Sequence, residues 1–471
     1  MVSTKGCTDL HVQVVSRSLV KASDSGIKPH VLAVSNLDLL MQNIRCSVFC
    51  IYRKPPTGDF NAVVATFQAG LPSLLNHFFP LAGRITANPS SGLPEVHCSN
   101  QGAELVVAEA DVALASLDYN AIGASVRKIQ LPYGDDDVAL SVQVVSFACG
   151  GFTVAWRTHH LLADGSALSL LVSAWSELAR SGKLAAASRP NNDRSVFRPR
   201  APPRYAAALD EAFTPLDPRR QVNVLTTEQS FVERLYYVDA SDIARLRDAA
   251  SRRQGGGERA TRVQAVSAYL WKALAGVVGE ADGHCRMGWR VDGRARVTAP
   301  ELVGAATRNY FGNFMTLSLR EARVEELQRL PLPEVAAMVR EAIAAPAYDE
   351  HFQELVDWVE DHKDGRYVET AILGLGSPQV SVTVMASFWM DTDFGFGVAA
   401  MAMPTATAGA RLCGGYVQIF SRPGDEGSWI VNAIVWPRLA AALESDEPRV
   451  FRPVTAEYLG LFAPQGPLCR L

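Results

Sequence analysis

The 471-residue chain lacks the marks of several protein classes. It has no run of 18 apolar residues, so we expect no membrane-spanning helix. Its first residues, MVSTKGCTDLHVQVVS, contain neither the apolar core nor the cleavage site of a signal peptide. The net charge is −4, whereas nucleic-acid binders usually carry a strongly basic domain. We therefore expect a cytoplasmic protein whose partners include neither a membrane nor a nucleic acid.

The eight cysteines are scattered along the chain and form no CxxC pair. A disulfide framework is not expected in so long a chain, and such cysteines typically behave as small buried apolar groups in a reducing cytosol. The chain has no Walker-type phosphate loop and no internal repeat that we can find. Neither a P-loop nucleotide enzyme nor a repeat protein is therefore indicated.

The composition is that of an ordinary globular protein, with 48% hydrophobic and 20% charged residues. Strand-like and helix-like patterns mix in both halves, which predicts a mixed α/β fold. Residues 183–222 contain six prolines and eight Lys/Arg with poor periodicity, and we expect them to form a solvated crossover linker. The predicted domains are thus residues 1–182 and 223–471.

Most of the candidate chemistry lies near the middle of the chain. Residues 141–147 and 152–158 are two short strand-like runs joined by a glycine turn, which predicts a hairpin. His159 and His160 follow it, and Asp164 begins a helical pattern that Gly182 ends. The apolar face of this predicted helix is Leu168, Leu171, Val172, Trp175 and Leu178.

The two histidines allow three interpretations. Adjacent strand residues point to opposite faces, so His159 and His160 cannot both serve one centre if the strand continues to them. One interpretation is a buried histidine, a surface histidine and an N-cap Asp164. A metal site made by both histidines and Asp164 is a weaker one. The third is a catalytic site, and a downstream motif favours it.

That motif is Asp393-Phe394-Gly395-Phe396-Gly397. Together with HxxxDG at 160–165 it resembles the BAHD family of plant and fungal acyl-CoA-dependent acyltransferases. Three further segments resemble that family in the same order over nearly the whole chain: LAGR at 81–84, DGRAR at 292–296 and YFGN at 310–313. The resemblance implies two similar-sized chloramphenicol-acetyltransferase-like domains with a solvent channel between them. It also implies that about 380–400 cross back to the N-terminal sheet, and that the chain is a monomer.

Acyl transfer from a thioester needs a base, a positioned carbonyl and a donor for the oxyanion. The resemblance assigns the base to His160 and treats His159 as structural. It pairs Asp164 with Arg294, or else Arg296, to hold the loop, and we expect Gly165 to allow a sharp backbone turn. Asp393, Gly395 and Gly397 are implied to be structural. Acyl-CoA would be the co-substrate, with no metal and no permanently bound cofactor.

The oxyanion and CoA contacts are less sharply indicated. Trp389 could supply an indole donor in an acyl pocket with Phe388 and Ser387, or it could be packed core. Phe396 stands where the family usually has tryptophan, and Val398 and Ala399 replace a basic residue and a proline. Candidate CoA contacts are Arg252, Arg253, Arg259 and Thr261, although a solvated loop explains these residues equally well.

The prediction of the substrates rests only on the residues of two motif segments. The NYFGN and DGRAR segments are closest to those of hydroxycinnamoyl and benzoyl users, so we expect an aromatic acyl group transferred to a hydroxyl of a small specialised metabolite. The same chemistry on a polyamine or arylamine is an alternative, to which acidic Asp357, Glu360 and Asp361 could contribute, unless they form a solvated helix face. A third hypothesis is that the chain is a non-catalytic relative that binds acyl-CoA.

Overall fold

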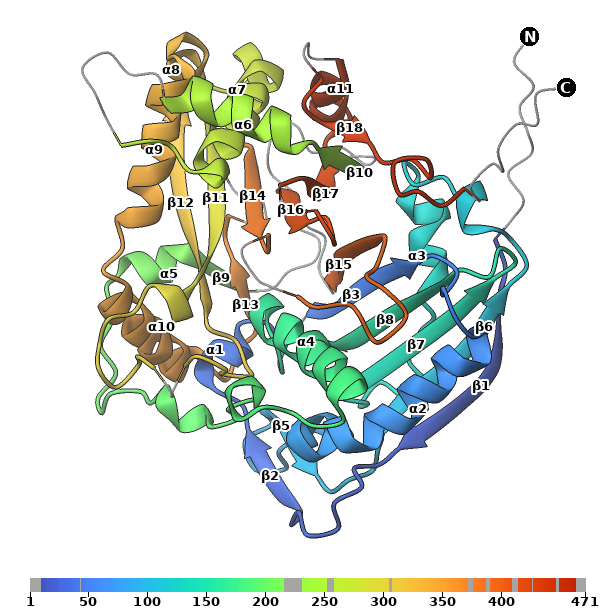
Figure 1. Ribbon diagram of the computed structural model, residues 1–471. Coiled ribbons are helices and arrows are strands. Elements are labelled where there is room, and N and C mark those ends of the chain that lie inside the picture. The colour runs from blue at the N-terminus through green and yellow to red at the C-terminus, as the bar shows by residue number, and fades with distance from the viewer. Residues whose placement is uncertain are drawn as a thin grey trace, which may run out of the picture.

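The structure is a computed structural model that describes most of the chain. The described residues are 10–42, 44–215, 231–251, 258–304, 307–371, 376–386, 390–408, 414–425, 427–445 and 449–462. Within them the chain folds into two halves, each built on one large mixed sheet (Figure 1). The predicted mixed α/β fold with two sheet-based domains is confirmed.

The first half is organised around a six-stranded sheet of the described residues. Its order is β1-β6-β7-β8-β3-β15, and only the β6–β7 pair is parallel. The strands are β1 (Val12–Val20), β6 (Ala103–Ala110), β7 (Leu140–Phe147), β8 (Phe152–His159), β3 (Ile44–Tyr52) and β15 (Met401–Ala408). The predicted hairpin is the antiparallel β7–β8 pair.

The second half contains a seven-stranded sheet of the described residues, in the order β12-β11-β14-β16-β17-β10-β18. Its strands are β12 (Met315–Arg323), β11 (His284–Asp292), β14 (Gln379–Val384), β16 (Gly415–Ser421), β17 (Trp429–Val435), β10 (Val232–Val238) and β18 (Arg452–Pro453). Small sheets join β9 (Phe213–Pro215) to β13 (Tyr367–Glu369), and β2 (His30–Ala33) to β5 (Pro94–Cys98) and β4 (Arg84–Ala87).

One strand crosses between the halves. β15 follows β14 in sequence, yet it pairs with β3 of the first sheet, with Thr405 opposite Ser47. The crossing was expected at about 380–400; β14 ends at Val384 and β15 begins at Met401. β14 remains in the second sheet because it pairs in parallel with both β11 and β16. The two halves therefore share a strand as well as an interface.

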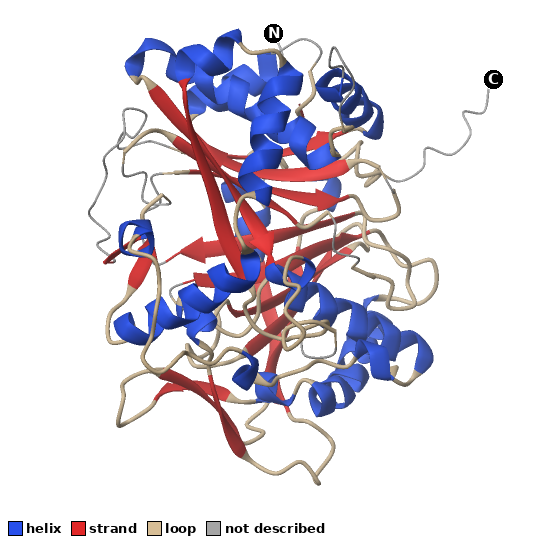
Figure 2. Ribbon diagram, turned by 90° about the vertical axis from the view of Figure 1, so that its left-hand side faces the viewer, coloured by secondary structure: helices blue, strands red, loops and turns tan. Residues whose placement is uncertain are grey.

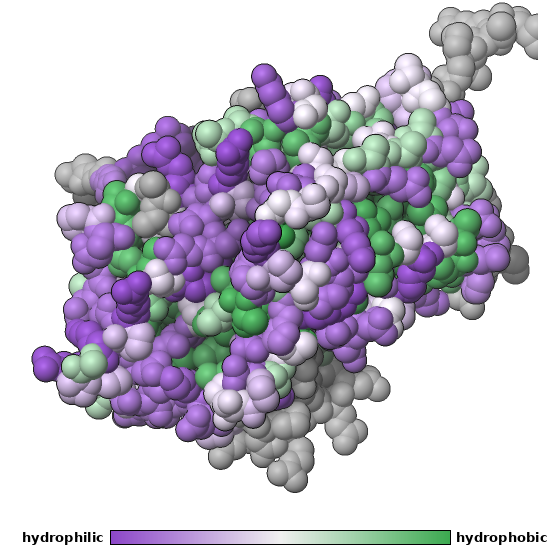
Figure 3. All heavy atoms as spheres, turned by 90° about the horizontal axis from the view of Figure 1, so that it is seen from below, coloured by the Kyte–Doolittle hydropathy of each residue, from purple (hydrophilic) through white to green (hydrophobic). Residues whose placement is uncertain are grey.

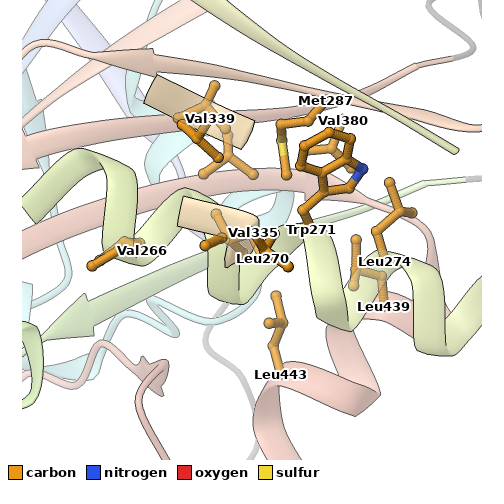
Figure 4. Close-up of a cluster of buried hydrophobic side chains, with 14 of the residues drawn as sticks. Val266, Leu270, Trp271, Leu274, Met287, Val335, Val339, Val380, Leu439 and Leu443 are labelled. Atoms are coloured by element: carbon orange, nitrogen blue, oxygen red, sulfur yellow. The ribbon is translucent and has the colours of Figure 1, made fainter. Parts of the chain in front are cut away.

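Helices cover the outer faces of both sheets (Figures 1 and 2). In the first half, α2 and α4 lie side by side over the sheet. In the second half, Trp271 and Leu274 of α7 pack with Val335 and Val339 of α9 (Figure 4). The helices are α1 (Asn36–Leu39), α2 (Phe60–His77), α3 (Val126–Ile129), α4 (Gly165–Ser181), α5 (Ala208–Ala212), α6 (Ala240–Ser251), α7 (Arg262–Val278), α8 (Val324–Arg329), α9 (Leu332–Ala344), α10 (Tyr348–His362) and α11 (Pro437–Ser445).

Strand alternation explains why the first sheet is buried on both faces. Val48 and Cys50 of β3 pack in the core beneath α2 and α4, whereas Phe49 and Ile51 face the second half of the molecule. Successive strand residues point to opposite faces, so one continuous apolar strand serves two cores. Ile430 of β17 meets this second, interdomain core from the other sheet.

The face seen from below is mainly hydrophilic and carries scattered hydrophobic patches (Figure 3). Among the described residues, no helix combines the length and the apolar character that crossing a bilayer requires.

The predicted linker is more ordered than a solvated loop. Its described part, up to residue 215, contains α5 and β9, and Arg194 in it is buried. Proline-rich composition suggested solvation, but one basic side chain of this segment is held inside by a carboxylate, as shown below. Residues 216–222 lie outside the described residues.

Candidate functional site

A cavity lies between the two halves and brings His160 together with residues far away in sequence. Ile44, Leu168 and Thr405 line it from the first half. Met385, Tyr416, Gln418 and Ile434 line it from the second. Most of these walls are apolar, as is typical of sites for small organic ligands. His160 is therefore placed where both halves can present groups to a ligand.

His160 reaches this cavity because the strand ends one residue before it. β8 ends at His159, and the amide of His160 donates to the Ile44 carbonyl at 2.9 Å. His159 lines a different cavity, next to Leu161 and Pro94. Burial, helped by the charge of Arg45, lowers the pKa of His159 to about 4. The two histidines thus point to different places, as strand alternation predicts.

The hydrogen-bond partner of the His160 ring is Asn313. Nδ1 of His160 lies 2.9 Å from Oδ1 of Asn313. The Asn313 amide nitrogen donates both to a carboxylate oxygen of Asp38 at 2.8 Å and to the His160 carbonyl at 2.7 Å. Both of those atoms only accept, so the amide cannot be turned round, and Oδ1 must accept from His160. The proton of a neutral His160 is therefore on Nδ1, and Nε2 carries the lone pair.

Asp38 holds Asn313 in place through hydrogen bonds. Asp38 is fully buried. Its carboxylate also accepts from the backbone N–H of Asn313 at 2.8 Å and from the backbone N–H of Ser35 at 2.9 Å. Its charge is balanced by Arg194, whose Nε lies 2.9 Å from Oδ2. Arg194 in turn donates to the carbonyls of Phe311 and Leu162. A buried charge needs such a partner, so this pair fixes the support of His160.

The electrostatic surroundings keep His160 neutral. Burial lowers its pKa, and Arg290 acts in the same direction, while Asp164 and the bond to Asn313 oppose this effect. An imidazole whose pKa lies below its ordinary value is deprotonated at neutral pH. The site can therefore offer a bare nitrogen as a proton acceptor within hydrogen-bond reach of a bound ligand.

Asp164 serves a different purpose, since its carboxylate faces Arg294. Nη1 and Nη2 of Arg294 donate to Asp164 at 2.8 and 3.2 Å. The same carboxylate accepts from the amides of Phe314, at 3.0 Å, and Ala167, which makes Asp164 the N-cap of α4. Burial alone would lower the pKa of Arg294, but Asp164 and Asp292 raise it, so the guanidinium stays charged. Asp164 thus holds the loop and does not orient the His160 ring.

Gly165 makes room for a neighbouring side chain and does not provide the sharp turn that was expected. Its φ is not in the left-handed region, so the sharp-turn explanation is wrong. A Cβ on Gly165 would lie 1.9 Å from Cε of Met385. Met385 lines the cavity from the second half. The missing side chain therefore permits a close approach of the two halves beside His160.

A charged pair forms part of the cavity wall. Arg290 of β11 makes a bidentate ion pair with Glu369 of β13. Arg290 lines the His160 cavity, while Glu369 lines a neighbouring cavity with His351 and Thr316. Burial alone would lower the pKa of Arg290, but the charge of Glu369 raises it. The pair therefore lies between the two cavities, with Arg290 facing one and Glu369 the other.

The DFGFG motif lies outside the His160 cavity. The Asp393 carboxylate accepts from the amides of Gly395 at 2.9 Å and Gly397 at 3.0 Å, and both glycines have positive φ. Phe394 stacks on Trp156. Phe396 makes edge contacts with Tyr52 and Phe152, with ring centroids 5.6 and 5.2 Å apart. The motif thus fastens the segment that leads into β15 to the first half.

None of the remaining candidates that the structure describes lines the His160 cavity. Arg259 donates to Asp248 at 2.8 Å, and Thr261 caps α7 with Gln264 in a capping box. Arg252, Arg253, Ser387, Phe388 and Trp389 lie outside the described residues. Asp357 is buried against Arg200, which contradicts a solvated face for it, and Glu360 pairs with Lys363. Neither Asp357 nor Glu360 lines the His160 cavity.

A metal site made by the two histidines and Asp164 does not form. His159 and His160 line different cavities, and Arg294 occupies the Asp164 carboxylate. Among the described residues, no group of three or more His, Cys, Asp or Glu side chains is arranged to hold a metal ion.

Comparison with known proteins agrees with this geometry. A model of the Transferase family matches residues 10–443. The chain belongs to this family, the BAHD acyltransferases. It is an acyl-transferring enzyme.

Two curated relatives of this family member take different acceptors. Omega-hydroxypalmitate O-feruloyl transferase of Arabidopsis thaliana is 27% identical over 85% of this chain and 86% of its own length. Agmatine hydroxycinnamoyltransferase 1 of Oryza sativa subsp. japonica is 30% identical over 75% of this chain and 80% of its own length. Among solved structures, F. graminearum TRI101 in complex with coenzyme A and deoxynivalenol has a TM-score of 0.73 at 15% identity, covering 90% of this chain and 99% of that one.

Sequence reasoning missed Asn313, Asp38, Arg194 and Arg290 as site residues. Asn313 ends the YFGN segment and Asp38 stands alone in an apolar stretch, so both offered a signal. Arg194 was one of eight basic residues in the linker, and no pattern set it apart.

Asp164→Ala should destabilise the protein by roughly 2–5 kcal/mol, because the buried Arg294 keeps only Asp292 as a carboxylate partner and α4 loses its N-cap. Urea unfolding of purified variants measures the loss. Arg296→Ala is the matched control: this exposed arginine contacts the Tyr348 ring at 5.8 Å and should cost about 0.5–1 kcal/mol. Equal losses for the two variants would contradict the structural role of Asp164.

Proposed function

We propose that this enzyme transfers an aromatic acyl group, hydroxycinnamoyl or benzoyl, from coenzyme A to the hydroxyl of a small specialised metabolite. His160 acts as the general base in a direct ternary complex. The observation that carries the proposal is the neutral His160 ring beside a mostly apolar cavity. Its Nδ1–H is bound to Asn313, and no described residue is hydrogen-bonded to its Nε2. The relatives that use feruloyl and hydroxycinnamoyl groups support the acyl class.

The donor is proposed to be an acyl-CoA, with no metal and no permanently bound cofactor. TRI101, which shares the fold, is bound to coenzyme A in its crystal structure, and this supports the choice of donor. The partners are then the acyl-CoA and one small acceptor. We further propose a cytoplasmic monomer of plant specialised metabolism, in line with the plant sources of both relatives.

In the proposed reaction, Nε2 of His160 takes the proton of the acceptor hydroxyl while its oxygen attacks the thioester carbonyl carbon. The tetrahedral intermediate collapses as the carbon–sulfur bond breaks. The imidazolium then returns the proton to the CoA thiolate, so the enzyme ends unchanged. The thioester supplies a good leaving group, and no enzymic nucleophile is needed. Trp389 remains a proposed oxyanion donor, and Arg252, Arg253, Arg259 and Thr261 remain proposed CoA contacts.

The charge of the cavity favours a hydroxyl acceptor over a cationic amine. Among the described residues that line it, Arg290 carries a permanent charge and no carboxylate is present. Glu369, in the neighbouring cavity, is already paired with Arg290. A protonated amine would therefore gain no ion pair from the described residues that line this cavity. Transfer to an amine is kept as the second candidate because one relative acylates agmatine.

A thiol-release assay tests the proposal. Purified protein is offered a panel of acyl-CoAs crossed with small alcohols and amines, and free CoA and product mass are followed. We expect release that requires an acceptor, with an aromatic acyl group dominant. His160→Ala should lower turnover by at least about 10² while the protein stays folded, and His159→Ala should not. CoA esters that bind without any release would instead indicate a non-catalytic relative.

The pH dependence should report His160. Because burial lowers its pKa below 6.5, kcat/KM should rise with pH and level off with an apparent pKa below that value. His159→Gln should leave this limb unchanged, since His159 lines another cavity. A limb centred above about pH 7.5 in the wild type, outside the range expected for this histidine, would contradict the assignment.

A further inference from the structure

Two arginines of the first sheet share one tyrosine ring. Arg45 of β3 and Arg157 of β8 lie on neighbouring strands, and the register of this pair places both side chains on the same face of the sheet. Their guanidinium carbons lie 4.8 and 4.4 Å from the centre of the Tyr133 ring. Tyr133 belongs to the loop of residues 132–137, which reads PYGDDD. Two like charges are therefore held beside one ring.

These three side chains carry buried donors that the described part of the chain does not satisfy. Nη1 of Arg45, Nη1 of Arg157 and the hydroxyl of Tyr133 are each buried without a hydrogen-bond partner among the described residues. Arg157 forms neither a hydrogen bond nor an ion pair with any described residue. Buried polar groups nearly always have a partner. Three such donors around one ring can be satisfied together by an acceptor from outside the chain.

The charge around the ring is also unbalanced. The nearby carboxylate of Glu104 is already paired with Arg17. Burial lowers the pKa of Arg157, and the charge of Arg45 acts in the same direction. A guanidinium that is taken out of water without a carboxylate partner is costly, and a bound anion relieves that cost.

One carboxylate of the 132–137 loop competes for the same charge. Oδ1 of Asp136 accepts from Nη2 of Arg45 at 3.1 Å, and the Asp136 carbonyl accepts from the same nitrogen at 3.2 Å. The Asp136 side chain is 98% exposed. Exposed ion pairs contribute little to stability, so an external anion can take the place of this carboxylate.

We propose that Arg45, Arg157 and Tyr133 bind a phosphate-type oxyanion. A phosphate group has enough oxygens to accept from both guanidiniums and from the Tyr133 hydroxyl at once. None of the three side chains lines the His160 cavity, so this site is separate from the proposed transfer reaction. The phosphate is either free in solution or carried by a larger molecule such as coenzyme A.

Calorimetric titration of the full-length protein with inorganic phosphate tests the site, with sodium chloride holding the ionic strength constant. The wild type should bind phosphate saturably with a Kd of about 1 mM or tighter. Arg157→Met should weaken binding at least about tenfold, because it removes a charge-assisted hydrogen bond, and Tyr133→Phe should weaken it about threefold. Asp136→Asn should strengthen binding about threefold or more, because the competing carboxylate is lost.

Arg422→Met is the matched control. Arg422 also lies over a tyrosine ring, that of Tyr458 at 4.2 Å, and its replacement changes the net charge equally. Phosphate affinity should be unchanged in this variant. Thermal unfolding checks that each variant is folded. Because Asp136 is exposed, Asp136→Asn keeps the test decisive even if Arg157→Met does not fold.

Titration with coenzyme A and with dephospho-CoA, which lacks the phosphate monoester, identifies the source of the phosphate. Tighter binding of coenzyme A that is lost in Arg157→Met would assign the site to that monoester. Equal binding of both, together with binding of inorganic phosphate, would assign it to a free anion. Absence of saturable phosphate binding in both the wild type and Asp136→Asn would overturn the inference. Wild-type affinity in folded Arg157→Met, or no gain of affinity in Asp136→Asn, would also overturn it.

Discussion

The buried ion pair between Asp164 and Arg294 is the interaction on which the rest of the site depends. Both side chains are nearly inaccessible, at 3% and 8% exposure. Through this pair the N-terminus of α4 is joined to the segment after β11, and Arg294 also donates to the carbonyls of Tyr310 and Gly312. Two charges removed from water must stay paired, so these segments cannot separate without a large cost. The geometry around His160 follows from this constraint.

Because of this ion pair, one residue holds the loop and a different residue orients the histidine ring. In a triad the carboxylate orients the imidazole directly. Here Asp164 is committed to Arg294, and Asn313, held by Asp38, orients His160. An amide oxygen fixes the tautomer without adding a full negative charge beside the ring. The His160 ring therefore stays neutral in a buried site that lines the cavity.

The sequence predicted the parts that depend on local pattern. Alternation and the 3.6-residue period located the β7–β8 hairpin and α4, and the motif resemblance paired Asp164 with Arg294. Asn313, Asp38 and Arg194 were missed as site residues because the contacts His160–Asn313, Asn313–Asp38 and Arg194–Phe311 join positions 117 to 275 residues apart, which no local period encodes. The role of Gly165 was misread for the same reason, since it depends on Met385 from the other half.

The central claim is that a neutral His160 carries its proton on Nδ1 and leaves Nε2 free. Nitrogen-15 NMR of histidine-labelled protein at neutral pH measures this directly, with His160→Gln assigning the signals. The structure predicts a protonated Nδ1 and an unprotonated Nε2 for His160, and loss of that fixed tautomer in Asn313→Ala. A proton on Nε2, or an imidazolium with both nitrogens protonated, would contradict the account.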